Sequence, residues 1–212
     1  MTSPARRFLA TLALVAASAG LLAPALAAES TDALSAASPE AIVRGVSKDV
    51  LDIISKNDKD AARQHDLADA RLTPLADFNR MTALAVGRYW RQATPEQQTQ
   101  LTREFKTMLV RTWVSVLSNH KDAQVDVKGA RPGGTDDEQS VHSVVTQSGQ
   151  SPISLDLNFE NTKAGWKVYD ISVEGISFIN SHRNQFSTVI RSDGIDGLIK
   201  QLSNANAQTA RK

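Results

Sequence analysis

Apolar residues recur every three or four positions through the first half of the chain, which predicts amphipathic helices. Ser38, Pro39 and Glu40 have the order of a helix start: an N-cap, a first-turn proline and an acid. Thr94 and Gln97 have the spacing of a capping box before a longer helix. The predicted helices cover 39–56, 76–91 and 95–119, with weaker short helices over 61–77.

After Asn119 the period of the pattern shortens to two, which predicts strands. In the clearest case Ile153, Leu155, Leu157 and Phe159 alternate with polar residues, so one face of this strand should be buried and the other wet. Short turn-forming segments separate the strand patterns and predict an antiparallel meander of four strands. These strands begin near residues 124, 141, 153 and 166.

Helical spacing returns after Gly175, is interrupted at 192–194, and ends near residue 203. The predicted fold class is therefore α+β: N-terminal helices, a four-stranded antiparallel sheet and C-terminal helices. Because the sheet has one apolar face, the helices should pack on that face. The short polar segments 28–38 and 204–212 predict a flexible N-terminus and a polar tail on either side of a single domain, 39–203.

The first 27 residues have the features of a secretory signal peptide. Arg6 and Arg7 precede an uncharged apolar stretch over 8–22, and Ala25 and Ala27 form a small-x-small cleavage site. Removing this segment leaves 185 residues and changes the formal net charge from +1 to −1, because two arginines leave without an acid. We expect export from a bacterium, although export alone does not separate the periplasm from the medium.

The composition of the mature chain excludes several classes of protein. There is no cysteine, so disulfides, thiolate metal sites and a lipoprotein anchor are ruled out. A near-neutral balance without a basic stripe argues against a nucleic-acid partner, since phosphate binding needs clustered Lys and Arg. No second apolar run approaches the ~20 residues of a membrane helix, so we expect a soluble mature protein.

Candidate catalytic groups are few. The four histidines, at 65, 120, 142 and 182, lack metal-ligand spacing, and we expect no metal site. Ser177 follows a glycine without the second glycine of a nucleophile elbow, which favours a helix N-cap. Asp170 lies among apolar neighbours: a structural cap is the favoured interpretation and a general base the alternative. Tryptophans 90, 113 and 166 are expected to pack in the core.

A series of blocks extends through 78–202. The first is ALAVGRYWRQATPEQ over 83–97, and the second runs from Phe105 to Trp113. The C-terminal blocks are 166–171, 174–177, Phe186, Arg191 and 194–198. In order and spacing they resemble the MlaC, or toluene-tolerance, family of periplasmic phospholipid-binding proteins, in which Tyr is common at the position of Trp113. Segment 57–77 matches less well, so nothing is carried over to it.

This resemblance implies a carrier without catalytic residues, whose only ligand is its phospholipid cargo. It implies a monomer that moves lipid between an outer-membrane lipoprotein complex and an inner-membrane ABC transporter with an MCE-domain protein, and so maintains outer-membrane lipid asymmetry. It also implies an apolar pocket between sheet and helices that encloses the acyl chains.

Apolar residues on the predicted inner faces are the candidates for such a pocket, because exposing the roughly 30 methylenes of a phospholipid would cost about 24 kcal/mol. Three alternatives stay open: these side chains simply fill the core, the scaffold is an exported isomerase-like or dehydratase-like enzyme, or it is an interaction protein with a solid core. The candidate lipid-binding residues are Leu84, Leu109, Trp113, Val116, Val145, Ile153, Leu155, Leu157, Phe159, Val168 and Ile171.

Overall fold

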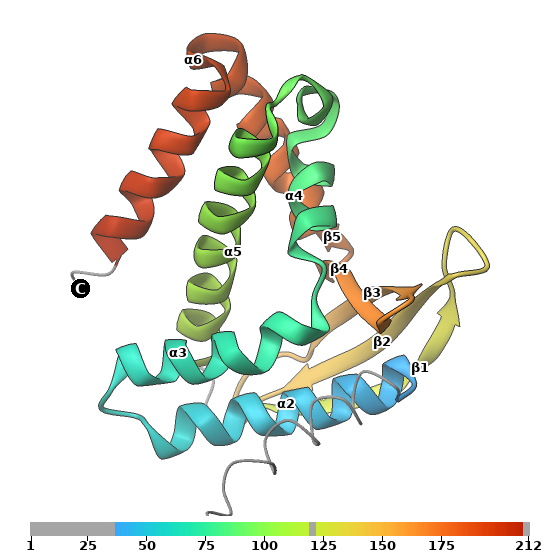
Figure 1. The fold of residues 1–212 in the computed structure, drawn as a ribbon. Helices are drawn as coiled ribbons and strands as arrows, with labels where there is room; N and C mark the ends of the chain where they lie inside the picture. The colour runs from blue at the N-terminus through green and yellow to red at the C-terminus, as the bar shows by residue number, and fades with distance from the viewer. Residues whose placement is uncertain (1–36, 119–121, 210–212) are drawn as a thin grey trace, which may run out of the picture.

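A computed structural model describes residues 37–118 and 122–209; the predicted signal peptide, 1–27, and residues 28–36 lie outside this part. Helices α3, α4 and α5 follow α2, with two short 3-10 turns between them, and the order agrees with the predicted helices. Their bounds are α2 Pro39–Lys56, α3 Ala61–Leu72, η1 Thr73–Leu75, α4 Phe78–Val86, η2 Gly87–Gln92 and α5 Pro95–Ser118. In Figure 1, α4 and α6 flank α5, while α2 and α3 form a hairpin that crosses its C-terminal end.

The predicted N-terminal caps of α2 and α5 are confirmed. The Ser38 hydroxyl accepts a hydrogen bond from the Ala41 amide, 3.4 Å away. At α5, the Thr94 hydroxyl accepts from the Gln97 amide at 3.2 Å, and the Gln97 side chain accepts from the Thr94 amide at 3.0 Å. These reciprocal bonds satisfy amides that have no partner inside the helix.

The sheet is antiparallel, in the order β1-β2-β3-β4-β5. Its strands are β1 Gln124–Pro132, β2 Glu138–Thr146, β3 Ile153–Thr162, β4 Gly165–Val173 and β5 Ile176–Ser177. The predicted number of four strands is wrong, because β5 is a fifth. It has only two residues, too few to show an alternating pattern. Glu174 and Gly175, both with positive φ, form the tight hairpin turn that leads into it.

A bulge in β4 explains how Val168 and Ile171, three residues apart, lie on the same apolar face. Val168 pairs with Phe159 and Ile171 pairs with Leu157, while Tyr169 has no paired residue in β3. The extra residue shifts the alternation by one position. Both aliphatic side chains therefore point toward the helices.

Helix α6 spans Phe178–Thr209 and bends at Gly194, whose φ is 74°. The predicted interruption is thus confirmed, but the predicted polar tail is wrong over 204–209, which remain helical. Asn206 is buried, and its Nδ2 donates to the carbonyl and the carboxylate of Glu104, each at 2.9 Å. A polar residue can be buried here because its hydrogen bonds are satisfied.

The main core lies between the helices and the inner face of the sheet. Phe105 of α5 is fully buried and meets Phe186 of α6 edge to face, with ring centroids 5.1 Å apart. The tryptophans that were expected in the core are partly buried and pack against it. No helix in the described part of the chain is long and apolar enough to cross a membrane.

Candidate functional site

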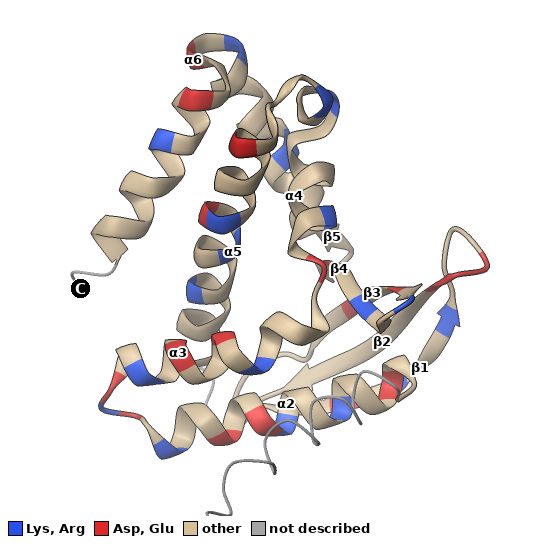
Figure 2. Ribbon diagram, in the orientation of Figure 1, with Lys and Arg blue, Asp and Glu red and all other residues tan. Residues whose placement is uncertain are grey.

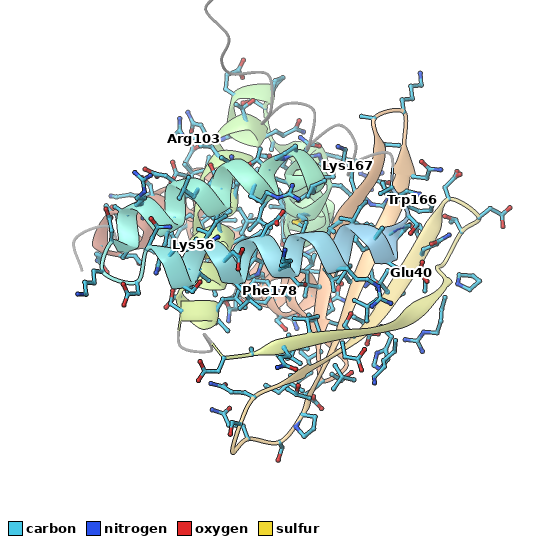
Figure 3. The ribbon with its side chains drawn as sticks, turned by 90° about the horizontal axis from the view of Figure 1, so that it is seen from below. Glu40, Lys56, Arg103, Trp166, Lys167 and Phe178 are labelled. Carbon is cyan, nitrogen blue, oxygen red and sulfur yellow. The ribbon has the colours of Figure 1, made fainter. Side chains whose placement is uncertain are left out.

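A cavity of about 290 Å³ lies between α2, α5 and the inner face of the sheet. None of its lining residues is charged, and only Ser47 and Thr112 carry a hydroxyl. The Thr112 hydroxyl donates to the Met108 carbonyl at 2.8 Å, which leaves that part of the wall without a free donor. Figure 3 views the region from below, with α2 running from Glu40 to Lys56 in front of the sheet and Phe178 beside it. Such a site can hold an apolar ligand by burial alone.

Eight of the eleven candidate residues line this cavity: Trp113, Val116, Val145, Leu155, Leu157, Phe159, Val168 and Ile171. The other three do not. Leu109 is fully buried one turn before Trp113 on α5, beyond the point where the cavity ends. Leu84 packs against the core on α4, and Ile153 is half-buried at the start of β3.

The largest group of lining residues that sequence reasoning missed comes from α2. Ile42, Val46 and Val50 follow one another at helical spacing and line the cavity together. This apolar stripe is visible in the sequence, but the sequence does not say that α2 covers the sheet. The other missed lining residues are Val43, Ser47, Leu51, Leu72, Leu75, Ala76, Thr112, Leu117, Ala123, Val125, Val173 and Phe178.

The two ends of the cavity differ in exposure. At the inner end Phe159 is 0% and Leu75 2% exposed. At the other end Val116 is 52% and Val173 42% exposed, although both belong to the wall. Ile176, which pairs with Val173, is 66% exposed. We call this end, at Val116 and Val173, the mouth of the cavity.

Along one side, α2 is held to the edge strand β1 by two side chains. The Ala130 amide donates to Glu40 Oε1, and Arg44 Nη2 donates to the Val127 carbonyl, both at 3.0 Å. An edge strand has unpaired backbone groups, and these bonds satisfy two of them. The helix thus closes the cavity along β1.

The inner end is joined to the helices by a polar cluster that we call the Arg80 cluster: Arg80, Glu138, Glu160 and Tyr169. The Arg80 guanidinium contacts the carboxylates of Glu138 and Glu160 and lies 3.9 Å from the centre of the Tyr169 ring. The hydrogen bond from Arg80 lowers the pKa of Glu138, and burial raises the pKa of Tyr169. A helix residue is therefore tied to β2, β3 and β4 at once.

Asp170 does not line the cavity. Its Oδ1 accepts from the amides of Ile171 and Ile179, at 2.8 and 3.2 Å, and its Oδ2 accepts from the Ser177 hydroxyl at 2.6 Å. The Ser177 hydroxyl in turn accepts from the Asn180 amide at 3.0 Å. The predictions of a structural cap at Asp170 and an N-cap at Ser177 are both confirmed.

The described residues contain no group of three or more His, Cys, Asp or Glu side chains placed to hold a metal ion. His120 lies outside the described residues. His142 contacts Asp156 at 3.0 Å on the polar side of the sheet, where Arg131 also meets Asp156 at 3.0 Å. His142 and Asp156 are a cross-strand pair of β2 and β3, and Arg131 reaches Asp156 from β1 across β2.

Comparison with known protein families identifies the family to which the chain with this apolar cavity belongs. Residues 44–204, more than half of the chain, match the family model described as MlaC protein. The chain belongs to the MlaC family. Among solved structures, it is similar to a phospholipid-binding protein from Ralstonia solanacearum in complex with a phospholipid. The two are 37% identical with a TM-score of 0.74, and the match covers 82% of this chain and 99% of the other.

The predicted family is thus confirmed, and so is the α+β fold in which helices cover an antiparallel sheet. In this MlaC-family chain, the sequence of segment 57–77 resembles the family less well than the blocks over 78–202. The structure places α3 and η1 there, and Leu72, Leu75 and Ala76 from this segment line the cavity.

Proposed function

We propose that the protein is a soluble periplasmic carrier that encloses the acyl chains of a phospholipid in the cavity between α2, α5 and the sheet. The observation that supports it most is a wall without any charged side chain, in a chain 37% identical to a protein solved with a phospholipid. Each unpaired polar group in such a wall would cost about 1–3 kcal/mol, so an uncharged lining favours acyl chains.

At about 290 Å³, the cavity lies just below the usual range for ligand sites, about 300–1,000 Å³. A diacyl lipid with roughly 30 methylenes needs more room if nearly all of its apolar surface is to leave water. We therefore expect the wall to widen on loading. Separation at the mouth would expose least additional surface, since Val116 and Val173 are already partly in water.

The test is extraction of the folded mature protein, purified from a bacterial host without detergent, followed by mass spectrometry. The expected result is co-purified diacyl phospholipid at close to one molecule per chain. If no lipid is found and added phospholipid does not bind either, the proposed function is wrong.

We further propose that the carrier moves lipid between an outer-membrane lipoprotein complex and an inner-membrane ABC transporter with an MCE-domain protein, and so maintains lipid asymmetry. Transfer between sites that both bury the chains needs no bond to break, so we propose neither a catalytic residue nor a cofactor. N-terminal sequencing of protein from a periplasmic extract should begin at Ala28. Retention of residues 1–27 in the exported protein would contradict this.

The alternative of an isomerase-like or dehydratase-like enzyme depended on Asp170 as general base. Both oxygens of that carboxylate accept hydrogen bonds from the start of α6 or the adjacent backbone, outside the cavity wall. A base must reach the proton that it abstracts, and Asp170 faces the helix end instead. The alternative of a solid-core interaction protein does not agree with the cavity itself.

A further inference from the structure

A group of arginines lies away from the cavity, where η2 meets α6. We call Arg88, Arg91, Arg183 and Arg191 the arginine cluster. None of the four forms an ion pair with any carboxylate among the described residues, whereas Arg71, Arg80 and Arg131 each do. No residue of the cluster lines the cavity. These four side chains are thus neither part of the cavity wall nor in a direct ion pair among the described residues.

The local fold brings these charges together. Gly87 ends α4 with φ +63°, a conformation that side chains rarely adopt, and turns the chain toward α6. A side chain at Gly87 would approach the Arg183 guanidinium, which shows how near the turn lies to α6. Figure 2 shows blue segments on the turn between α4 and α5 and on α6 at this end of the molecule.

Three of the guanidinium groups are held in place by neutral acceptors. Arg88 Nη2 donates to the Tyr89 hydroxyl at 2.8 Å, and Arg183 Nε donates to the Leu84 carbonyl at 2.9 Å. Arg191 donates to the hydroxyls of Ser187 and Thr188, at 3.3 and 3.2 Å. Such bonds orient an arginine and leave its charge available to an outside anion.

Tyr89 lies among these charges. The hydrogen bond from Arg88 lowers the pKa of the Tyr89 phenol, with smaller contributions from Ser187 and from the charge of Arg191. Acidic residues also occur at this end: Asp193 accepts from Ser192 and Asp196 accepts from Gln97, so these contacts do not pair either carboxylate with an arginine of the cluster. The four arginines outnumber these two carboxylates and that of Glu96, in the first turn of α5.

We propose that the arginine cluster is a docking surface for a carboxylate-rich face of a partner protein. Oriented guanidinium groups match carboxylates in geometry as well as in charge. The large apolar side chains that are exposed, Leu67, Val116, Val173 and Ile176, belong to α3, α5, β4 and β5, so η2 and α6 contribute none to insert into a bilayer. That favours an acidic protein over a lipid surface.

The position of the cluster supports the same choice. It lies at the N-terminal end of α5, whereas Val116 at the mouth lies near the C-terminal end of this 24-residue helix, which is roughly 36 Å long. A flat membrane at the cluster would be far from Val116, but a protein can dock at the cluster and leave the mouth free. The requirement that the mouth stay free rests on the proposed carrier function. The existence of the arginine cluster does not depend on that function.

The experiment uses the folded mature protein with isotope-labelled backbone amides, titrated with hexa-glutamate and, separately, with phosphatidylglycerol/phosphatidylethanolamine vesicles. Hexa-glutamate should shift the amides of 87–91 and 183–191, with an affinity that falls as salt is added. The variant Arg88→Gln/Arg191→Gln should bind the peptide roughly three- to tenfold more weakly. Lys56→Gln/Lys128→Gln removes the same charge from paired lysines elsewhere and should leave peptide binding unchanged.

Equal weakening by both double variants would overturn the proposal, because net charge alone would then explain binding. Vesicle binding that depends on Arg88 and Arg191 without a peptide effect would overturn it in favour of a membrane. Absence of peptide binding to the unmodified protein would also overturn it. Co-purified lipid is measured on the same samples: lipid retained in the Arg88→Gln/Arg191→Gln variant separates docking from loading, and lipid absent from every sample counts against the carrier function alone.

Discussion

The two ends of the cavity are held in different ways. At the inner end, the Arg80 cluster joins α4 to three strands, and the Asp77 amide donates to the Val168 carbonyl at 2.9 Å. At the mouth, Val116 and Val173 meet water without a comparable polar connection to each other. Directional contacts fix geometry, whereas apolar contacts can be exchanged for a ligand's methylenes at little cost. Under the proposed function, we expect a ligand to displace contacts at the mouth while the inner end keeps its arrangement.

The largest effect is expected from a charge inside the wall. Leu157 lies between Val141 and Ile171 on the inner face, so Leu157→Asp would place a carboxylate against aliphatic side chains. Burying that charge costs several kcal/mol, which excludes acyl chains from this part of the cavity. We expect loss of co-purified lipid by mass spectrometry and a fold that survives by circular dichroism.

The matched control is Ser140→Asp, which puts the same charge next to Val141 on the opposite face of β2, across from Arg131. Lipid content should be unchanged. If Leu157→Asp unfolds the protein outright, the inner face is packed core, and the contrast drawn between the inner end and the mouth fails. Lipid content and circular dichroism are then measured again on Leu155→Asp, which lies nearer the mouth.

The second prediction concerns the inner end. Arg80→Met removes both ion pairs and leaves Glu138 and Glu160, each with a largely buried side chain, without a cationic partner. We expect the free energy of unfolding in urea to fall by about 2–3 kcal/mol. Lys56→Met breaks an exposed pair with Asp52 and should cost less than about 0.5 kcal/mol. Equal changes in the free energy of unfolding for the two variants would show that the Arg80 cluster stabilises the fold no more than an exposed ion pair does.

The same cluster predicts a dependence on pH. Because Arg80 lowers the pKa of Glu138 in the folded state, the stability from this contact is complete above the unfolded pKa, about 4.3, and is lost as pH falls through the folded value. The difference in urea midpoint between the unmodified protein and Arg80→Met should therefore shrink as pH falls from 7 to 3. A difference that stays constant over that range would exclude the ion pair as its cause.

Much of the fold could be predicted because its signals are local. The caps at Ser38 and Thr94 and the alternation over β3 each depend on residues a few positions apart. The burial of Asn206 depends instead on Glu104, about a hundred positions away, and local polarity therefore indicated a tail. For the same reason the site was predicted on the sheet and α5 but not on α2: the helix that covers the sheet is chosen by long-range packing.

The smallest effect is expected at the mouth. Val116 and Val114 are two residues apart on α5, but Val116 is 52% exposed and Val114 only 6%. Val→Thr replaces a methyl by a hydroxyl, which costs stability only where the hydroxyl loses water without gaining a partner. Val116→Thr should change the free energy of unfolding by less than about 0.5 kcal/mol, and Val114→Thr should lower it by about 1–2 kcal/mol. Lipid extraction from Val116→Thr then sharpens the comparison, because retained lipid means that the mouth contributes little to holding cargo. A large loss in the free energy of unfolding of this variant would mean instead that the mouth is packed as tightly as the inner end.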